Sequence, residues 1–135
     1  MKKEKDWEAV VRKEHELGER AICKALQFLM RNWKLNGLEI AKLLHLSLGT
    51  VNRWLSTGRV PIGKPPHCSG KQAVLHLLAV HKNLYIMFTR PENQLAWLKT
   101  KHPQLNLVPF EKMGESLDGL VFIQRYLEFE RDRGA

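Results

Sequence analysis

Cysteines, long apolar runs and export signals are scarce or missing in this sequence of 135 residues. The two cysteines, Cys23 and Cys68, are too few for a disulfide framework and have no partner at metal-ligand spacing, which favours a reducing compartment. The longest apolar run, 73–88, is interrupted by polar side chains and is too short to span a bilayer. Charged residues interrupt any apolar segment behind the basic start, so no export signal is predicted. We therefore expect a cytoplasmic protein with no membrane partner, no metal and no cofactor.

Alternating strand patterns with hairpin turns are also missing, whereas helical spacing recurs along the chain, so the sequence predicts an all-α fold. The first helical region covers 6–33, with Gly18 separating two helices or bending one. Ser69 is expected to cap a helix through 88, and Thr89 with Glu92 to cap the next. A short helix is expected from 108 to Gly114. Ser116 is expected to cap the last helix, from 117 to about 131.

The segment 38–55 has the apolar spacing of two short helices packed across a tight turn. Ile40 and Leu44 share one face of the first helix, and Leu46 fills the turn. Val51 and Trp54 line the inner face of the second helix, and the small Ala41 is expected where the two helices approach most closely. This spacing predicts a helix-turn-helix, although an ordinary helical hairpin is the alternative. The outward residues of the second helix carry hydrogen-bonding groups and no acid, as a helix in the DNA major groove requires. These DNA-contact candidates are Ser47, Gly49, Thr50, Asn52 and Arg53.

Positive charge is concentrated around this motif. Between residues 20 and 64 the only acid is Glu39, so this window carries most of the formal net charge of +8. Basic side chains gain affinity for DNA by displacing counterions from the phosphates. We therefore expect Arg59 and Lys64, in the Pro- and Gly-rich segment after the motif, to contact the DNA backbone. A solvated connector explains that segment equally well.

The last helix is predicted to be apolar nearly all round. At about 100° per residue, aliphatic residues cover one side, and Phe122, Tyr126 and Phe129 fall on roughly the opposite side. One side covers the protein's own core, so the aromatic side needs a second surface. That surface belongs to this chain, to a sister subunit or to a different protein, and the sequence leaves all three open.

A helix ending in Trp97-Leu98, a His-Pro-x-Leu turn and a proline that opens the next helix follow one another in the second half of the chain. Their order and spacing resemble the toxin-binding domain of the Xre/MbcA/ParS type of antitoxin. With the upstream motif, the resemblance covers about residue 20 to the C-terminus. There are departures, since His102 stands where an Asn is usual and His45 replaces the glycine of the motif's turn. The matching segments are 84–88, 91–100, 102–105 and 108–113.

The resemblance implies a type II antitoxin that represses its own operon and neutralises a cognate toxin, often an NAD-consuming toxin of the RES-domain type. With the helical pattern, it divides the chain into a DNA-binding unit at 1–58, a linker at 59–70 and a helical toxin-binding unit at 71–135. A homodimer is expected, because one such helix contacts too few base pairs for useful specificity. The toxin-contact candidates are Phe122, Arg125, Tyr126, Phe129, Arg131 and Arg133.

Two other classes of function compete with this interpretation. The first is a dimeric helix-turn-helix regulator without a toxin, whose aromatic face forms the dimer. The second is an enzyme, with His67-Cys68 as base and nucleophile or His76 and His81 as ligands. Adjacent residues on a flexible strand rarely face each other, and two side chains five residues apart on a helix point about 140° apart. We therefore predict that the chain is not an enzyme.

Overall fold

The computed structural model describes the backbone of residues 2–62 and 69–134, and within these ranges the side chains of 9, 13, 16–62 and 70–133. In this part of the chain the fold is all-α and contains no β-strand, as the sequence predicts. The helices are α1 (Lys2–Trp33), α2 (Gly37–Leu44), α3 (Leu48–Thr57), α4 (Ser69–Met87), α5 (Pro91–Lys99), α6 (Pro109–Glu115) and α7 (Leu117–Gly134).

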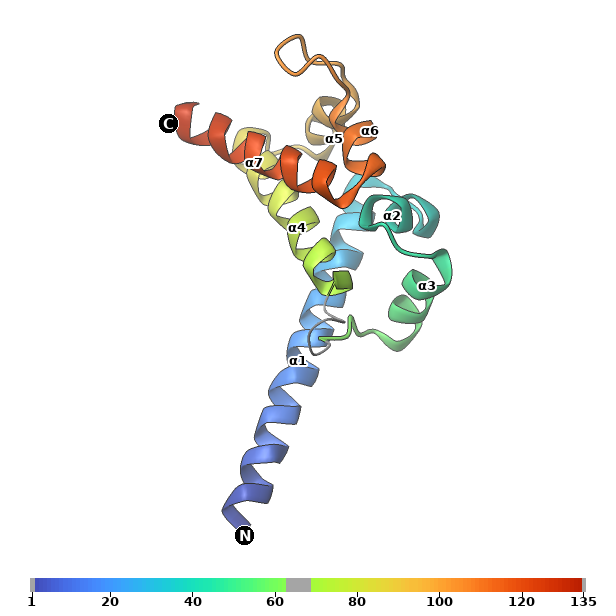
Figure 1. Cartoon of the computed structure of the whole chain (residues 1–135), viewed down its shortest axis with the longest axis vertical. Coiled ribbons are helices and arrows are strands. Elements are labelled where there is room, and N and C mark those ends of the chain that lie inside the picture. Colours follow the sequence, from blue (N-terminus) through green and yellow to red (C-terminus); the bar gives the residue numbers. More distant parts are fainter. Residues whose placement is uncertain (1, 63–68, 135) are drawn as a thin grey trace.

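Helix α1 is longer than the sequence predicts. It passes through Gly18 without interruption, so the expectation of two separate helices is wrong. A glycine inside a helix costs only about 1 kcal/mol relative to alanine, which the rest of a long helix outweighs. The missing side chain leaves room for Ile62, whose Cδ1 would lie 3.2 Å from a Cβ at Gly18. The first half of α1 extends away from the other helices (Figure 1).

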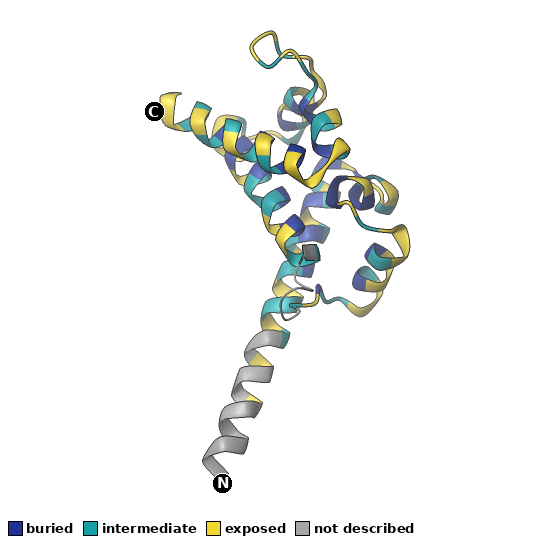
Figure 2. Cartoon of the chain, viewed as in Figure 1, coloured by how far each residue is buried: buried dark blue, intermediate teal, exposed yellow. Residues whose placement is uncertain are grey.

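A single hydrophobic core runs from α1 to α7. Trp33 of α1, Leu77 and Leu84 of α4, and Ile123 of α7 are all at most 1% exposed. Helix α4 packs against both α1 and α7, and buried residues lie along all three helices (Figure 2). Helix α7 packs on α4 and α6, and α6 in turn contacts α2. The core therefore joins residues of the predicted segments 1–58 and 71–135.

The predicted linker 59–70 is ordered at both of its ends. Val60 is fully buried, and its N–H donates to the carbonyl oxygen of Glu19 in α1 at 3.0 Å. Ser69 is the first described residue of α4, and its predicted cap bond lies outside the described side chains. Gly70 follows it in α4, where a Cβ would lie 2.8 Å from the ring of Trp54. Residues 63–68 lie outside the described residues.

The predicted helix caps agree with the structure in one case and differ in another. Ser116 begins α7, because its Oγ accepts a hydrogen bond from the N–H of Gly119 at 3.0 Å, which confirms the prediction. Thr89 does not cap α5, since Arg90 occupies the N-cap position and makes no side-chain cap bond. Proline has a fixed φ and no N–H, so Pro91 is itself the first helical residue and Thr89 lies one position too early.

A buried glutamine in the first turn of α5 connects three helices. Gln94 is fully buried, and its Oε1 accepts hydrogen bonds from Trp33 Nε1 at 2.9 Å and from Asn32 Nδ2 at 3.3 Å. Its Nε2 donates to the carbonyl oxygen of Phe88, directly after α4, at 2.9 Å. A buried amide is tolerated only when its polar atoms are paired, as they are here. Gln94 therefore fixes α5 against the ends of α1 and α4.

Helices α6 and α7 approach so closely at Gly119 that a side chain there has no room. A Cβ at Gly119 would overlap the carbonyl oxygen of Lys112. Backbone cannot move aside as the end of a side chain does, so we expect Gly119→Ala to lower the free energy of unfolding by about 1–3 kcal/mol in urea denaturation. Gly114→Ala is the matched control, since its Cβ would meet only the flexible Lys42 side chain, at 3.4 Å. Equal stability of the two variants would contradict the close approach.

Candidate functional site

Helices α2 and α3 form two short, individually capped helices joined by a tight turn. Asn36 caps α2, with its Oδ1 accepting from the N–H of Glu39 at 2.9 Å and its own N–H donating to Glu39 Oε1 at 3.1 Å. His45 ends α2 in the left-handed conformation, with φ 60° and ψ 42°. Ser47 begins α3, because its Oγ accepts from the N–H of Thr50 at 3.1 Å. Both helix starts are therefore set by local side-chain bonds.

The predicted inner face of these helices is confirmed. Five of the six residues expected there are buried, and Leu46 in the turn is partly buried against the core. Trp54 also meets the start of α4 at Gly70. The opposite side of α3 must therefore face away from the core. The five buried residues are Ile40, Ala41, Leu44, Val51 and Trp54.

The outer face of α3 contains two polar side chains that no other described residue engages. Asn52 and Arg53 are exposed, and neither side chain has a hydrogen-bond partner among the described residues. Ser47 and Gly49 are exposed as well, whereas Thr50 is partly buried. The hydroxyl groups of Ser47 and Thr50 lie 2.8 Å apart and serve the helix cap. Of the five predicted DNA contacts, Asn52 and Arg53 are therefore the best placed to bind a ligand.

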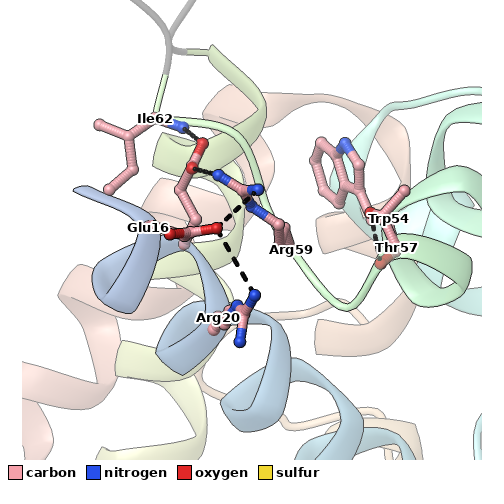
Figure 3. Close-up of polar contacts among 7 residues, drawn as sticks. Glu16, Arg20, Trp54, Thr57, Arg59 and Ile62 are labelled. Carbon is pink, nitrogen blue, oxygen red and sulfur yellow. Dashed lines mark hydrogen bonds and ion pairs between the residues drawn. The ribbon is translucent and has the colours of Figure 1, made fainter. Parts of the chain in front are cut away.

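Arg59, just beyond α3, is partly exposed and pairs with two carboxylates of α1. Its Nη1 lies 3.2 Å from Glu16 Oε1 and its Nη2 2.8 Å from Glu19 Oε1, both on α1 (Figure 3). The hydrogen bond to Glu19 raises the pKa of the guanidinium, which stays charged in any case. The second oxygen of Glu19 accepts from the N–H of Ile62 at 2.9 Å. Arg59 thus ties the chain after α3 to α1, and its contact with the DNA backbone stays a prediction. Lys64 lies outside the described residues.

The turn between α2 and α3 contacts α6. His45 Nε2 lies 2.8 Å from the carbonyl oxygen of Met113, and because a carbonyl only accepts, the imidazole donates this bond. Lys42 of α2 lies against Gly114, the next residue of α6. A histidine in the left-handed region costs more than a glycine. Here its side chain makes a bond that glycine cannot make, which accounts for His45 at this position.

The aromatic side of α7 is largely exposed. Phe122 is 46% and Phe129 60% exposed. The alternative that the aromatic side is covered by the chain itself is therefore wrong for these two residues within the described part of the chain, which leaves a sister subunit or a different protein. Lys112 Nζ lies 5.9 Å from the centre of the Phe122 ring. Arg125, on the same face, is exposed too. This face therefore presents aromatic rings together with cations.

Tyr126 is partly buried beside the loop that follows α5. Its ring stacks on Trp97 with centroids 6.4 Å apart, and its hydroxyl donates to Gln104 Oε1 at 3.1 Å. Burial raises the pKa of this hydroxyl, and the nearby carboxylate of Glu130 adds to the rise. Together with His102, these residues line a hollow of about 300 Å³ next to the exposed face of α7. Tyr126 is therefore mainly part of the wall of this hollow and is only partly accessible to a partner.

The two terminal arginines of α7, Arg131 and Arg133, have different surroundings. Arg131 Nη1 donates to Oδ1 of the buried Asn83 in α4 at 2.9 Å. This bond ties the end of α7 to α4, so the partly exposed Arg131 has a structural contact, and its contact with a toxin stays a prediction. Arg133 is exposed and pairs with Glu130 at 3.4 Å, and its guanidinium lies 5.8 Å from the centre of the Phe129 ring. Arg133 therefore remains on the exposed face.

The histidines considered for catalysis have separate surroundings. His76 Nδ1 lies 2.6 Å from Gln124 Oε1, whereas His81 contacts Asn32 and the ring of Phe28. Burial lowers the pKa of His81, which favours its neutral form. In the described residues no group of three or more His, Cys, Asp or Glu side chains is arranged to hold a metal ion. His67-Cys68 lies outside those residues.

No protein-family model matches this chain, and no curated protein matches its sequence. Across the described ranges, none of the helices combines the length and the apolar character needed to cross a membrane. The candidate binding sites are the two exposed surfaces, on α3 and on α7.

Proposed function

We propose that this chain is a DNA-binding antitoxin of the cytosol. It contacts the operator of its own operon through α3 and binds a cognate protein toxin through the exposed face of α7. The observation that carries the proposal is the presence, on one small fold, of two separate exposed surfaces of different chemistry. One has free polar side chains and no acid, and the other has exposed aromatic rings. An NAD-consuming toxin of the RES type is the class that the family resemblance suggests.

The chemistry of α3 supports the DNA half of the proposal. Asparagine pairs with the adenine edge and arginine with the guanine edge in the major groove, and both types occur here on adjacent, exposed positions, Asn52 and Arg53. Helix α3 contains no acidic residue that would repel phosphate. Other basic residues between positions 20 and 64, such as Lys42 and Lys34, are exposed and supply an attraction to the DNA phosphates that does not depend on base sequence.

Arg53→Ala tests this half of the proposal. On a duplex taken from the DNA that precedes its own gene, we expect binding to weaken by about 1–3 kcal/mol because a bidentate base contact is lost. On a scrambled duplex the loss should be smaller, so specificity falls in a fluorescence-anisotropy titration. Lys101→Ala, an exposed lysine after α5, is the control that should preserve specificity. An equal loss on both duplexes for Arg53→Ala would contradict base contact by this residue.

A dimeric DNA-binding regulator without a toxin remains the second candidate. The exposure of Phe122 and Phe129 supports it as well, because two copies of this face would cover each other. Co-purification separates the two candidates. A tight complex with the product of the adjacent gene supports the antitoxin, whereas a dimer that binds the operator and no other protein supports the regulator.

A further inference from the structure

Helix α1 has two faces that are both suited to packing. One face contributes Leu26, Leu29 and Trp33 to the core, each at most 1% exposed. On the opposite face, residues follow one another at alternating spacings of four and three, and all are exposed. Leu17 is 60% and Phe28 52% exposed there. We call this second face the outer stripe, and its described residues are Leu17, Ala21, Lys24, Phe28 and Arg31.

The outer stripe has the spacing of a two-stranded coiled coil. Apolar residues at alternating intervals of three and four form a seam along one side of a helix. In the sequence the same spacing continues toward the N-terminus with Glu14, Val10 and Trp7. This part of α1 extends beyond the other helices (Figure 1). A helical segment that packs against no other helix is only marginally stable in water, so a partner helix would stabilise this extension.

We propose that the outer stripe of α1 pairs with the outer stripe of a second copy in an antiparallel coiled coil. The register that places Leu17 opposite the partner's Ala21 also places Phe28 opposite the partner's Val10. In the same register Lys24 lies opposite the partner's Glu14. Each of these pairings occurs twice, because a twofold axis relates the copies. The inference is independent of whether the protein binds DNA or a toxin.

Charge decides the antiparallel direction. A parallel, in-register pair would place Lys24 against the partner's Lys24 and Glu14 against the partner's Glu14, and such like-charge pairs are unfavourable. The antiparallel register turns both repulsions into attractions. It also places the extension of each copy over the other copy's Phe28, whose ring lies 5.8 Å from that of His81 in α4. The exposed Tyr85, stacked on His81, widens this apolar surface.

A charge exchange on the full-length chain tests the interface. By sedimentation equilibrium, we expect the parent to have twice the 15.7 kDa mass of one chain. Lys24→Glu and Glu14→Lys should each sediment at the mass of one chain, because each creates two like-charge pairs. The double variant Lys24→Glu with Glu14→Lys should return to the dimer mass, since it restores opposite charges. Lys101→Glu, away from the stripe, is the charge-matched control and should remain dimeric.

Circular dichroism checks that every variant keeps the helical content of the parent, which is expected because Lys24 is exposed. A parent that sediments as a single chain would overturn the proposal, and so would single variants that keep the dimer mass. A double variant that stays monomeric while each single variant is folded would overturn the antiparallel register and the proposal with it. If either residue had only a structural role, the double variant would not recover the dimer mass.

Discussion

Replacing Phe122 and Phe129 together by alanine is expected to abolish tight binding of the protein partner while the chain stays folded. Buried aromatic anchors carry about 2 kcal/mol or more each, so the pair should account for roughly a thousandfold in affinity. The rings are 46% and 60% exposed, so their loss removes little from the core. Calorimetric titration with the product of the adjacent gene measures the affinity, and operator binding by the same variant should be unchanged.

Leu75→Ala is the matched control for this change, because Leu75 is an exposed apolar residue of α4, 39% accessible. It should leave partner binding as in the parent. If the double phenylalanine variant loses its dimer mass and operator binding together, the face is a dimer interface and the regulator without a toxin is the better description. A double variant that unfolds would contradict the exposed position of the two rings.

Val51→Asp is expected to unfold the α2–α3 unit. Val51 is fully buried between the two helices, and a carboxylate there has no charged partner to compensate its lost hydration. The expected loss is several kcal/mol, about the whole stability of many small domains. Because the core is continuous, thermal denaturation should show a much lower midpoint for the whole chain rather than a separate transition.

Ser56→Asp provides the comparison for Val51→Asp. It places the same charge on the same helix at an exposed position, so its melting temperature should stay close to that of the parent. Native stability in Val51→Asp would mean that Val51 faces solvent and that the helical register of α3 is wrong. Operator binding by Ser56→Asp should be weaker only at low salt, where an added negative charge near phosphate matters most.

Local spacing predicts much of the α2–α3 unit. The inner faces of both helices follow from intervals of three and four residues, and such intervals have the same meaning in any helix. Ser116 at the start of α7 and the two-sided apolar pattern of α7 are local in the same sense. The positions of Asn52 and Arg53 on the outer face follow as soon as Val51 and Trp54 are placed inside.

Side-chain partners far apart in sequence could not be predicted in this way. In the sequence, Arg59 and Arg131 look like basic residues without partners. In the structure Arg59 pairs with Glu16 and Glu19, and Arg131 bonds to Asn83, all about forty to fifty residues away in sequence. No spacing marks Gln94 as a buried junction. No sequence pattern predicts the role of Gly119 either, although α7 approaches the backbone of α6 closely there.

The all-helical fold, the register of α2 and α3, and the chemistry of the two faces of α7 follow from the sequence alone. The tertiary fold sets which cations remain free, which polar residues are buried, and that the outer stripe of α1 faces away from the core. The physical reason is the range of the interactions. Helical periodicity and capping act within a few residues, whereas burial and ion pairing depend on which helices the folded chain places side by side.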